Sequence, residues 1–141
     1  MGVRRVFGYP GDGINDVFGA LNRANGKIEF IQARREEMAA FMASAYAKFT
    51  GKLGVCIATS GPGAAHLVTG LYDARLDHMP VLAIIGQQAR TAMGGHYQQE
   101  VDLASMLNGP PLPAPPSFTR LALAGLAALS LVERREKGRP S

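Results

Sequence analysis

Two adjacent carboxylates, Glu36 and Glu37, stand where a helix is expected to begin after a short apolar strand. The N-terminus of a helix favours a carboxylate by about 0.3–1 kcal/mol, so complementarity to the helix dipole is one sufficient explanation of the pair. The second explanation is a ligand site, because ligands of open parallel sheets bind beyond the carboxyl ends of the strands. The residue types alone leave both explanations open.

Three glycine-containing loops, at residues 8–13, 60–63 and 94–95, follow or flank expected strands. Gly61 and Gly63 would let the backbone approach a ligand ring or a phosphate. The alternative is that these glycines only make tight turns between strands and helices. No glycine-lysine pair is followed by Ser or Thr, and Gly11-Asp12-Gly13 lacks the third glycine of a dinucleotide fingerprint. The loops therefore give little support to nucleotide binding.

The remaining polar candidates carry weaker signals. His66, His78 and His96 do not have the spacing of metal ligands, so no metal site is predicted. The run Gln98-Gln99-Glu100 fits either polar ligand contacts or a solvated start of a helix. Cys56 lies in an apolar run, and a single cysteine cannot build a disulfide framework.

Four short apolar runs alternate with helical patterns over the first 108 residues. Strands are expected at residues 3–7, 28–31, 53–58 and 81–86, and helices at 14–25, 36–50, 64–75 and 97–107. Asp12 is expected to cap the first helix, and Gly51 to end the second, whose inward positions are taken as Met38, Met42, Ala45 and Phe49. This order predicts a three-layer α/β/α fold with a parallel, right-handed sheet, incomplete at both ends.

The chain changes character at residue 109. Five of its nine prolines fall between Pro110 and Pro116, and an apolar stretch at residues 121–132 precedes a basic end. We therefore expect a domain at residues 1–108 and a Pro-rich segment with a basic tail at 109–141. One hypothesis is that the segment is translated out of frame; the alternative is a genuine linker and tail.

Composition restricts the partners. The chain has a net charge of +4, but residues 1–108 carry ten Lys and Arg against nine Asp and Glu. A near-neutral domain without a basic stripe argues against nucleic-acid binding. The longest apolar run is too short to span a bilayer, and no leader opens the chain, so a soluble cytoplasmic protein is expected.

Four motifs together resemble one family. VFGYPGDGINDVF, ARREEMAAFMASAYAKFTG, GVCIATSGPGAAHLVTGLYDARLDHMPVLAIIGQ and GGHYQQEVDL occur in the order seen in the pyrimidine-binding, N-terminal domain of thiamine-diphosphate-dependent enzymes. The chain looks most like the acetolactate synthase and pyruvate oxidase branch. The resemblance covers roughly residues 3–107.

The resemblance implies a role for particular residues. Glu36, rather than Glu37, would hydrogen-bond the aminopyrimidine ring of thiamine diphosphate and promote the imino form that removes the thiazolium proton. Arg35 stands where histidine is usual; a nearby guanidinium would lower the pKa of Glu36, whereas burial would raise it. The cofactor pocket would also include Tyr9, Pro10, Gly11, Gly61, Pro62 and Gly63, with Gln99 facing the substrate.

The resemblance also indicates what this chain would lack. Relatives carry a middle domain and a third domain that binds the diphosphate through magnesium, and some bind FAD. Their active site lies between two subunits, so a family-type homodimer or a full-length homologue is the expected partner. The expected function is a truncated 2-keto acid decarboxylase or carboligase domain, inactive alone, and enzymatic activity of the chain itself is left open. The alternative is a non-catalytic module that pairs with a full-length family member.

Overall fold

The computed structural model of the chain describes residues 2–108. The expectations for residues 109–141, namely the Pro-rich segment, the apolar stretch and the shifted frame, lie outside the described residues.

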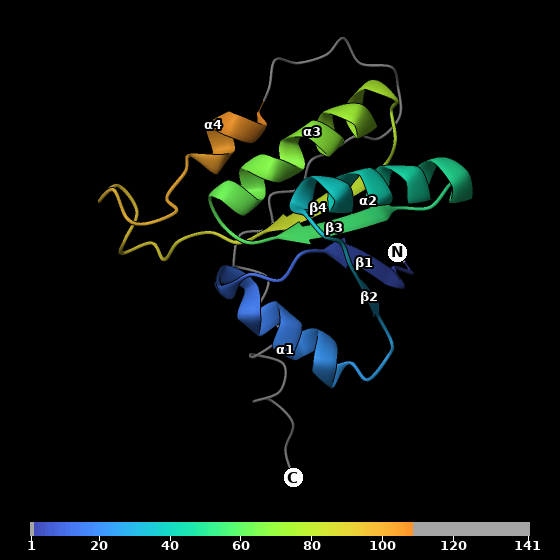
Figure 1. The fold of residues 1–141 in the computed structure, drawn as a ribbon, viewed down its shortest axis with the longest axis horizontal. Coiled ribbons are helices and arrows are strands. Elements are labelled where there is room, and N and C mark those ends of the chain that lie inside the picture. The colour runs from blue at the N-terminus through green and yellow to red at the C-terminus, as the bar shows by residue number, and fades with distance from the viewer. Residues whose placement is uncertain (1, 109–141) are drawn as a thin grey trace, which may run out of the picture.

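Four parallel strands form one sheet, with helices on both faces (Figure 1). The sheet order is β2-β1-β3-β4, and the helices α2 and α3 cover one face while α1 lies against the other. The three-layer α/β/α prediction is confirmed. The strands are β1 (Arg5–Gly8), β2 (Glu29–Gln32), β3 (Gly54–Ala58) and β4 (Val81–Ile85). The helices are the short 3-10 helix η1 (Asp12–Ile14), α1 (Asn15–Arg23), α2 (Glu36–Thr50), α3 (Pro62–Leu76) and α4 (Leu103–Leu107).

The core has one half on each side of the sheet. All five residues of β3 are buried, as expected for a central strand covered on both faces. Because side chains alternate along a strand, Cys56 packs toward α2 and α3, whereas Val55 and Ile57 pack toward α1. Because the four strands are parallel, their carboxyl ends lie along one edge of the sheet, where the loops after β1, β3 and β4 begin.

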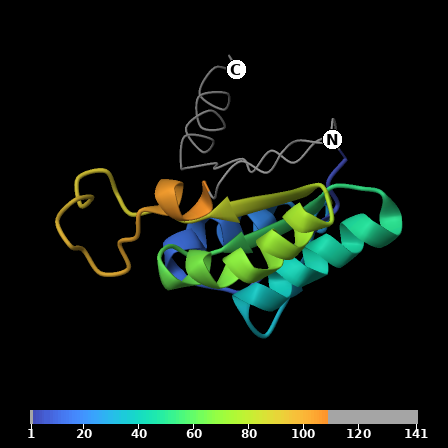
Figure 2. The ribbon, with the colours of Figure 1, turned by 90° about the horizontal axis from the view of Figure 1, so that it is seen from above.

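Helices α2 and α3 run side by side at unusually close range (Figure 2). A Cβ atom added at Gly70 of α3 would stand 2.6 Å from the Cβ of Ala40 and 2.8 Å from the backbone nitrogen of Phe41. The buried face of α2 accordingly consists of small residues: Ala39, Ala40, Ala43, Ser44 and Ala47.

The predicted inward stripe of α2 was therefore wrong in part. Met38 is 48% exposed and Phe49 is 90% exposed, because the small-residue face lies against α3 and the larger apolar side chains are displaced outward. The predicted end of the helix is confirmed: Gly51 has φ 65°, a left-handed conformation that glycine adopts without strain.

Two further predictions of local structure were wrong. Asp12 does not cap α1; its Oδ1 accepts a hydrogen bond from the Gly13 backbone N–H at 2.9 Å, and the one-turn η1 intervenes, so that α1 starts later. The helix predicted over 97–107 spans only α4, because Gln99 has φ 63° and cannot continue a right-handed helix. Among residues 2–108, no helix is both long and apolar enough to cross a lipid bilayer.

Candidate functional site

The candidate site lies at the carboxyl ends of β1 and β3, where the first loop packs on the turn after β3. The Thr59 hydroxyl accepts a hydrogen bond from the Gly13 backbone N–H at 3.2 Å. A Cβ atom at Gly11 would stand 2.6 Å from the Thr59 Cβ, so this position has no room for a side chain. The glycines of the first loop therefore bring its backbone against the Ser-Gly-Pro-Gly turn.

Glu36 is the first residue of α2 and reaches across to the first turn of α3. Its side chain is 15% exposed, and its Oε2 lies 3.0 Å from Nδ1 of His66. The other oxygen, Oε1, faces Gly63, where an added Cβ would stand 3.6 Å away. The structure thus brings two of the predicted site residues, Glu36 and Gly63, together.

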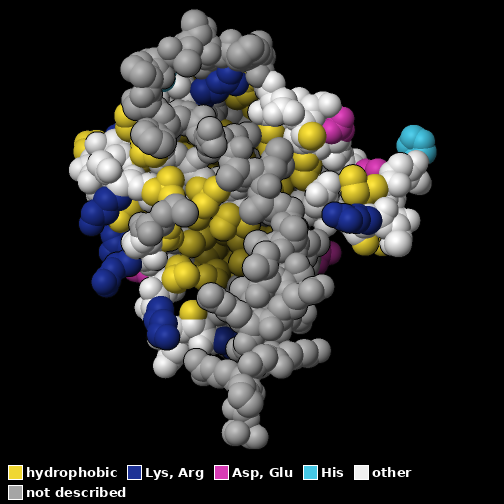
Figure 3. All heavy atoms as spheres, turned by 180° about the vertical axis from the view of Figure 1, so that it is seen from behind, with side chains coloured by type: hydrophobic (Ala, Val, Ile, Leu, Met, Phe, Trp, Pro, Cys, Tyr) yellow, Lys and Arg dark blue, Asp and Glu magenta, His cyan; other side chains and the backbone are white. Residues whose placement is uncertain are grey.

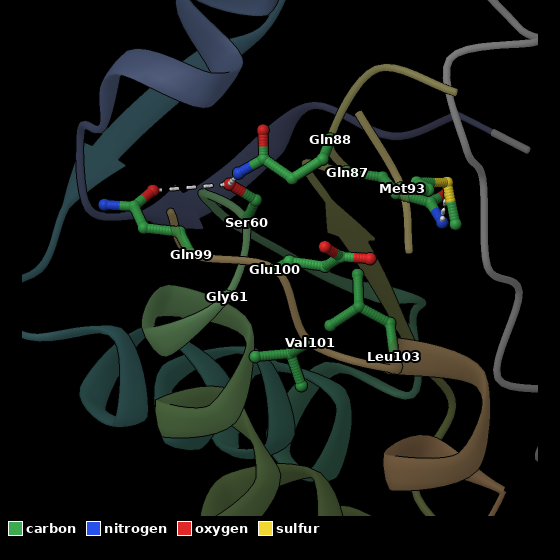
Figure 4. A pocket seen from close by; sticks show the side chains of 9 residues that line it. All are labelled: Ser60, Gly61, Gln87, Gln88, Met93, Gln99, Glu100, Val101 and Leu103. Atoms are coloured by element: carbon green, nitrogen blue, oxygen red, sulfur yellow. Dashed lines mark hydrogen bonds between the residues drawn. The ribbon is translucent and has the colours of Figure 1, made fainter. Parts of the chain in front are cut away.

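Gly61 and Gln99 meet on the other side of the same turn. Gly61 has φ 58° and is buried, and a Cβ atom there would stand 2.3 Å from the backbone oxygen of Gln99. The Ser60 hydroxyl donates to Oε1 of Gln99 at 3.4 Å and accepts from Nε2 of Gln88 at 3.2 Å (Figure 4). The turn at residues 60–63 therefore has Glu36 on one side and Gln99 on the other.

A small cavity lies between this turn and the connection after β4. Figure 4 shows that its lining side chains come from the turn and from the long loop leading to α4. Its volume of about 10 Å³ is roughly the space of one water molecule, too little for an organic ligand. The Glu100 carboxylate holds the loop by accepting hydrogen bonds from the backbone N–H groups of Gly94 and Tyr97, which lower the pKa of Glu100.

The remaining predicted cofactor residues are not joined to Glu36 by hydrogen bonds. Tyr9 is 39% exposed and Pro10 is exposed in the first loop, while Pro62 is exposed at the start of α3. Within the part of the chain that the structure describes, the side chain of Glu36 makes its hydrogen bond to His66. The geometry therefore groups Glu36, Gly63 and His66 at the centre, with Tyr9 and Pro10 at the periphery.

Arg35 contacts Glu37 rather than Glu36, and its expected influence on Glu36 stays a prediction. Nη1 of Arg35 donates to Oε1 of Glu37 at 3.3 Å, and the Arg35 side chain is 75% exposed. Arg35 itself is the N-cap residue of α2 and has an extended backbone. The basic ring that reaches Glu36 belongs instead to His66, which the sequence reasoning set aside. Its position three residues after Gly63, on the same face of α3, is the signal that would have identified it.

Glu36, Glu37 and His66 also approach the geometry of a cation site. Each offers one ligand atom, and these atoms lie within 4.8 Å of one another. Glu37 is paired with Arg35 and Glu36 contacts His66, so all three side chains already have partners within the described residues. The prediction of no metal site considered only the spacing of the histidines, and it stays a prediction.

The chemistry of the donor set fits an aminopyrimidine ring. A carboxyl group can share a proton with a ring nitrogen, and Glu36 holds one largely shielded from water at a helix N-terminus. Gly63 has no side chain beside Oε1 of Glu36, whereas Gln99 already fills the space beside Gly61, where an added Cβ would stand 2.3 Å from the Gln99 backbone oxygen. The residues present therefore fit one end of such a cofactor, and Glu36 is the group that would hold it.

Comparison with known proteins identifies the family of the chain. Residues 1–106 match the family model described as thiamine pyrophosphate enzyme, N-terminal TPP binding domain. The fold and the match define the class, and the chain belongs to this family.

Its relatives include a pyruvate oxidase and several acetolactate synthases. The chain is 50% identical over 105 residues to a putative thiamine pyrophosphate-containing protein, YdaP, of Bacillus subtilis, covering 74% of this chain and 18% of the relative. It is 50% identical over 101 residues to a pyruvate oxidase of Lactiplantibacillus plantarum, covering 72% and 17%. It is 51% identical over 106 residues to the large subunit of acetolactate synthase isozyme 2 of Escherichia coli, covering 75% and 19%. The chain thus spans less than a fifth of the length of these relatives.

Proposed function

We propose that residues 1–108 bind the aminopyrimidine end of thiamine diphosphate through Glu36 and contribute half of a 2-keto acid decarboxylase or carboligase site. The observation that carries the proposal is the shielded Glu36 carboxylate facing Gly63 in a chain of this family. When bound, the cofactor supplies the carbon nucleophile that attacks the keto group of the substrate.

The roles proposed for the chain's own residues follow from their positions. Glu36, the first residue of α2, shares a proton with the ring at Oε1 or Oε2. His66 orients the Glu36 carboxylate through the 3.0 Å contact, so it is a positioning residue. Gln99, held by Ser60, stands at the opposite side of the turn and is proposed to face the substrate. General acid–base catalysis of this kind contributes about 10²- to 10⁴-fold to a rate.

The other half of the site would come from a second chain. The proposed partner is a family-type homodimer or a full-length homologue, whose third domain would bind the diphosphate and magnesium; FAD would belong to such relatives as well. Support comes from the fraction of the relatives that this chain spans, less than a fifth. By itself the chain is proposed to be inactive.

The second candidate is a non-catalytic module that pairs with a full-length family member. The observation that favours it is the number of large apolar side chains exposed on α2 and α3: Met38, Phe41, Phe49, Tyr72 and Leu76. Exposed apolar surface of this kind often marks a protein contact.

A rescue experiment tests the proposal. A full-length relative that carries glutamine at the position matching Glu36 is mixed with the 141-residue chain, and exchange of the thiazolium proton is followed in the presence of magnesium and thiamine diphosphate. The wild-type chain is expected to restore exchange at least 100-fold above the relative alone. The Glu36→Gln chain is expected to restore none, and Glu37→Gln, which removes the neighbouring charge, serves as the matched control.

The outcomes separate the two candidates. Rescue by wild type and Glu37→Gln, but not by Glu36→Gln, supports the catalytic half-site. Co-sedimentation of the two chains without any rescue supports the interaction module. Equal rescue by all three chains would exclude Glu36 as the proton-sharing group.

A further inference from the structure

A second, larger cavity lies at the opposite end of the sheet from Glu36. It has a volume of about 310 Å³ and is lined by Gly2, Val3, Arg4, Arg5, Tyr46, Lys52 and Leu53, at the amino ends of β1 and β3. That volume is at the lower end of the range for small-molecule sites. The cavity contributes nothing to the site described above.

The charges around this cavity are one-sided. Three cationic side chains line it, and no carboxylate does among residues 2–108. Arg5 donates from Nε to Oε2 of Glu29 at 2.7 Å, whereas Arg4 and Lys52 have no ion pair among the described residues. Figure 3 shows Lys and Arg side chains at several places on one face of the molecule, around an area of apolar side chains.

One nearby element opposes this positive potential. The C-terminus of α2 carries about half a negative charge. Two of its last carbonyls are already satisfied, since the Thr50 hydroxyl donates to the Tyr46 oxygen at 2.6 Å and the Gly51 N–H donates to the Ala47 oxygen at 2.9 Å. The cavity has three cations, from which the Glu29 carboxylate takes one charge and the C-terminus of α2 about half a charge. The net charge at the cavity is therefore between about +1 and +2.

The cavity also has an apolar wall held in place. The Tyr46 ring packs against Phe7 with a centroid distance of 5.9 Å, and Phe7 is only 6% exposed. Val3 and Leu53 are partly buried against the core on the α1 side of the sheet. An apolar or aromatic group of a ligand would therefore meet preformed surface beside the cations.

We propose that this cavity binds a small phosphate monoester whose organic part is apolar or aromatic. The phosphate group carries about −1.5 to −2 charges at pH 7, which matches the net charge of the cavity. Arg4 and Arg5 offer planar guanidinium donors to the phosphate oxygens, and Lys52 adds a point charge. The organic group lies against Tyr46 and Leu53.

Phenyl phosphate is the probe, titrated into the full 141-residue chain at low salt and followed by calorimetry and by amide chemical shifts. Phenyl phosphate is expected to bind at least tenfold more tightly than either inorganic phosphate or phenol, with shift changes centred on Arg4, Arg5 and Lys52. The double variant Arg4→Ala/Lys52→Ala is expected to weaken binding at least about tenfold. The Arg4 and Lys52 side chains are both exposed, so circular dichroism should show that this variant folds like the wild type.

Lys27→Ala/Arg90→Ala is the matched control, because it removes the same net charge from exposed positions outside the cavity. This control should retain binding within about twofold, and affinity should fall as salt is added. Equal weakening by both double variants would reduce the effect to net charge and overturn the proposal. Binding of phenol as tight as that of phenyl phosphate, or shift changes centred elsewhere, would overturn it as well.

Discussion

The close crossing of α2 and α3 predicts an unusual response to a glycine substitution in α3. Gly70 lies in the middle of that helix, where alanine is normally preferred over glycine by about 1 kcal/mol. At Gly70, however, the new methyl group would stand 2.6 Å from the Cβ of Ala40 and 2.8 Å from the Phe41 nitrogen. Neither atom belongs to a flexible side chain, so the two helices themselves must separate.

A second glycine in the chain serves as a control for the helix propensity of alanine relative to glycine. Gly19 lies inside α1, and a Cβ atom there would meet only the far end of the Arg23 side chain, at 3.2 Å. Both Gly→Ala substitutions gain the same helix propensity, but overpacking costs typically about 1–3 kcal/mol. Gly19→Ala should therefore stabilise the chain by up to about 1 kcal/mol, and Gly70→Ala should be less stable than Gly19→Ala by about 1–3 kcal/mol.

Urea unfolding of the full chain, followed by far-ultraviolet circular dichroism, measures this difference. The slopes of the unfolding free energy against urea should agree among the variants, so that the midpoints report stability alone. A Gly70→Ala variant as stable as Gly19→Ala would refute the close packing of α2 on α3.

Three other properties follow from the buried and paired groups. Burial raises the pKa of the Cys56 thiol to about 12, so a thiol reagent at pH 8 should modify it only after urea unfolds the chain; prompt modification of the folded chain would contradict this. The hydrogen bond from the Ser44 hydroxyl is the largest cause that lowers the pKa of the part-exposed Asp73, and the hydrogen bond from Lys48 is the second. The resulting stabilisation of the fold is present above the ordinary carboxyl pKa of about 3.9, and it is lost as the pH falls through the lowered pKa. Ser44→Ala should therefore cost about 1 kcal/mol at pH 7 and less at pH 3, and an equal loss at both pH values would refute the coupling. Glu100→Gln should speed hydrogen exchange at the backbone amides of Gly94 and Tyr97, which donate hydrogen bonds to the Glu100 carboxylate. Unchanged exchange at these amides would show that the loop is held by other contacts.

The sheet was predictable from sequence because its signals are local. Leu53 to Ala58 is an apolar run of strand length, and β3 occupies most of it and is buried throughout. Gly51 marks the end of α2 because it adopts a left-handed conformation there, which favours glycine over residues with a Cβ atom. Such signals depend on a few neighbouring residues, so they survive without knowledge of the tertiary structure.

Errors arose where distant segments decide the outcome. The inward face of α2 depends on Gly70, which lies on another helix and selects the alanine face over Met38 and Phe49. The contact of His66 with Glu36 likewise forms only when α3 packs beside α2. The turn before α4 is an exception, because Glu100 accepts hydrogen bonds from the backbone N–H groups of Gly94 and Tyr97, which are only six and three residues earlier in the chain. The first two outcomes are tertiary contacts that local periodicity does not encode.

The strand order has a consequence for biosynthesis. β1 is made first but lies inside the sheet, where Phe7 pairs with both Ile31 of β2 and Cys56 of β3. A ribosome therefore releases β1 well before the strand that must cover its second edge, and closing that long loop slows folding. Until β3 emerges, the nascent β1 and β2 pair presents an open edge to neighbouring chains, so co-translational chaperone protection should matter most between the synthesis of β2 and that of β3.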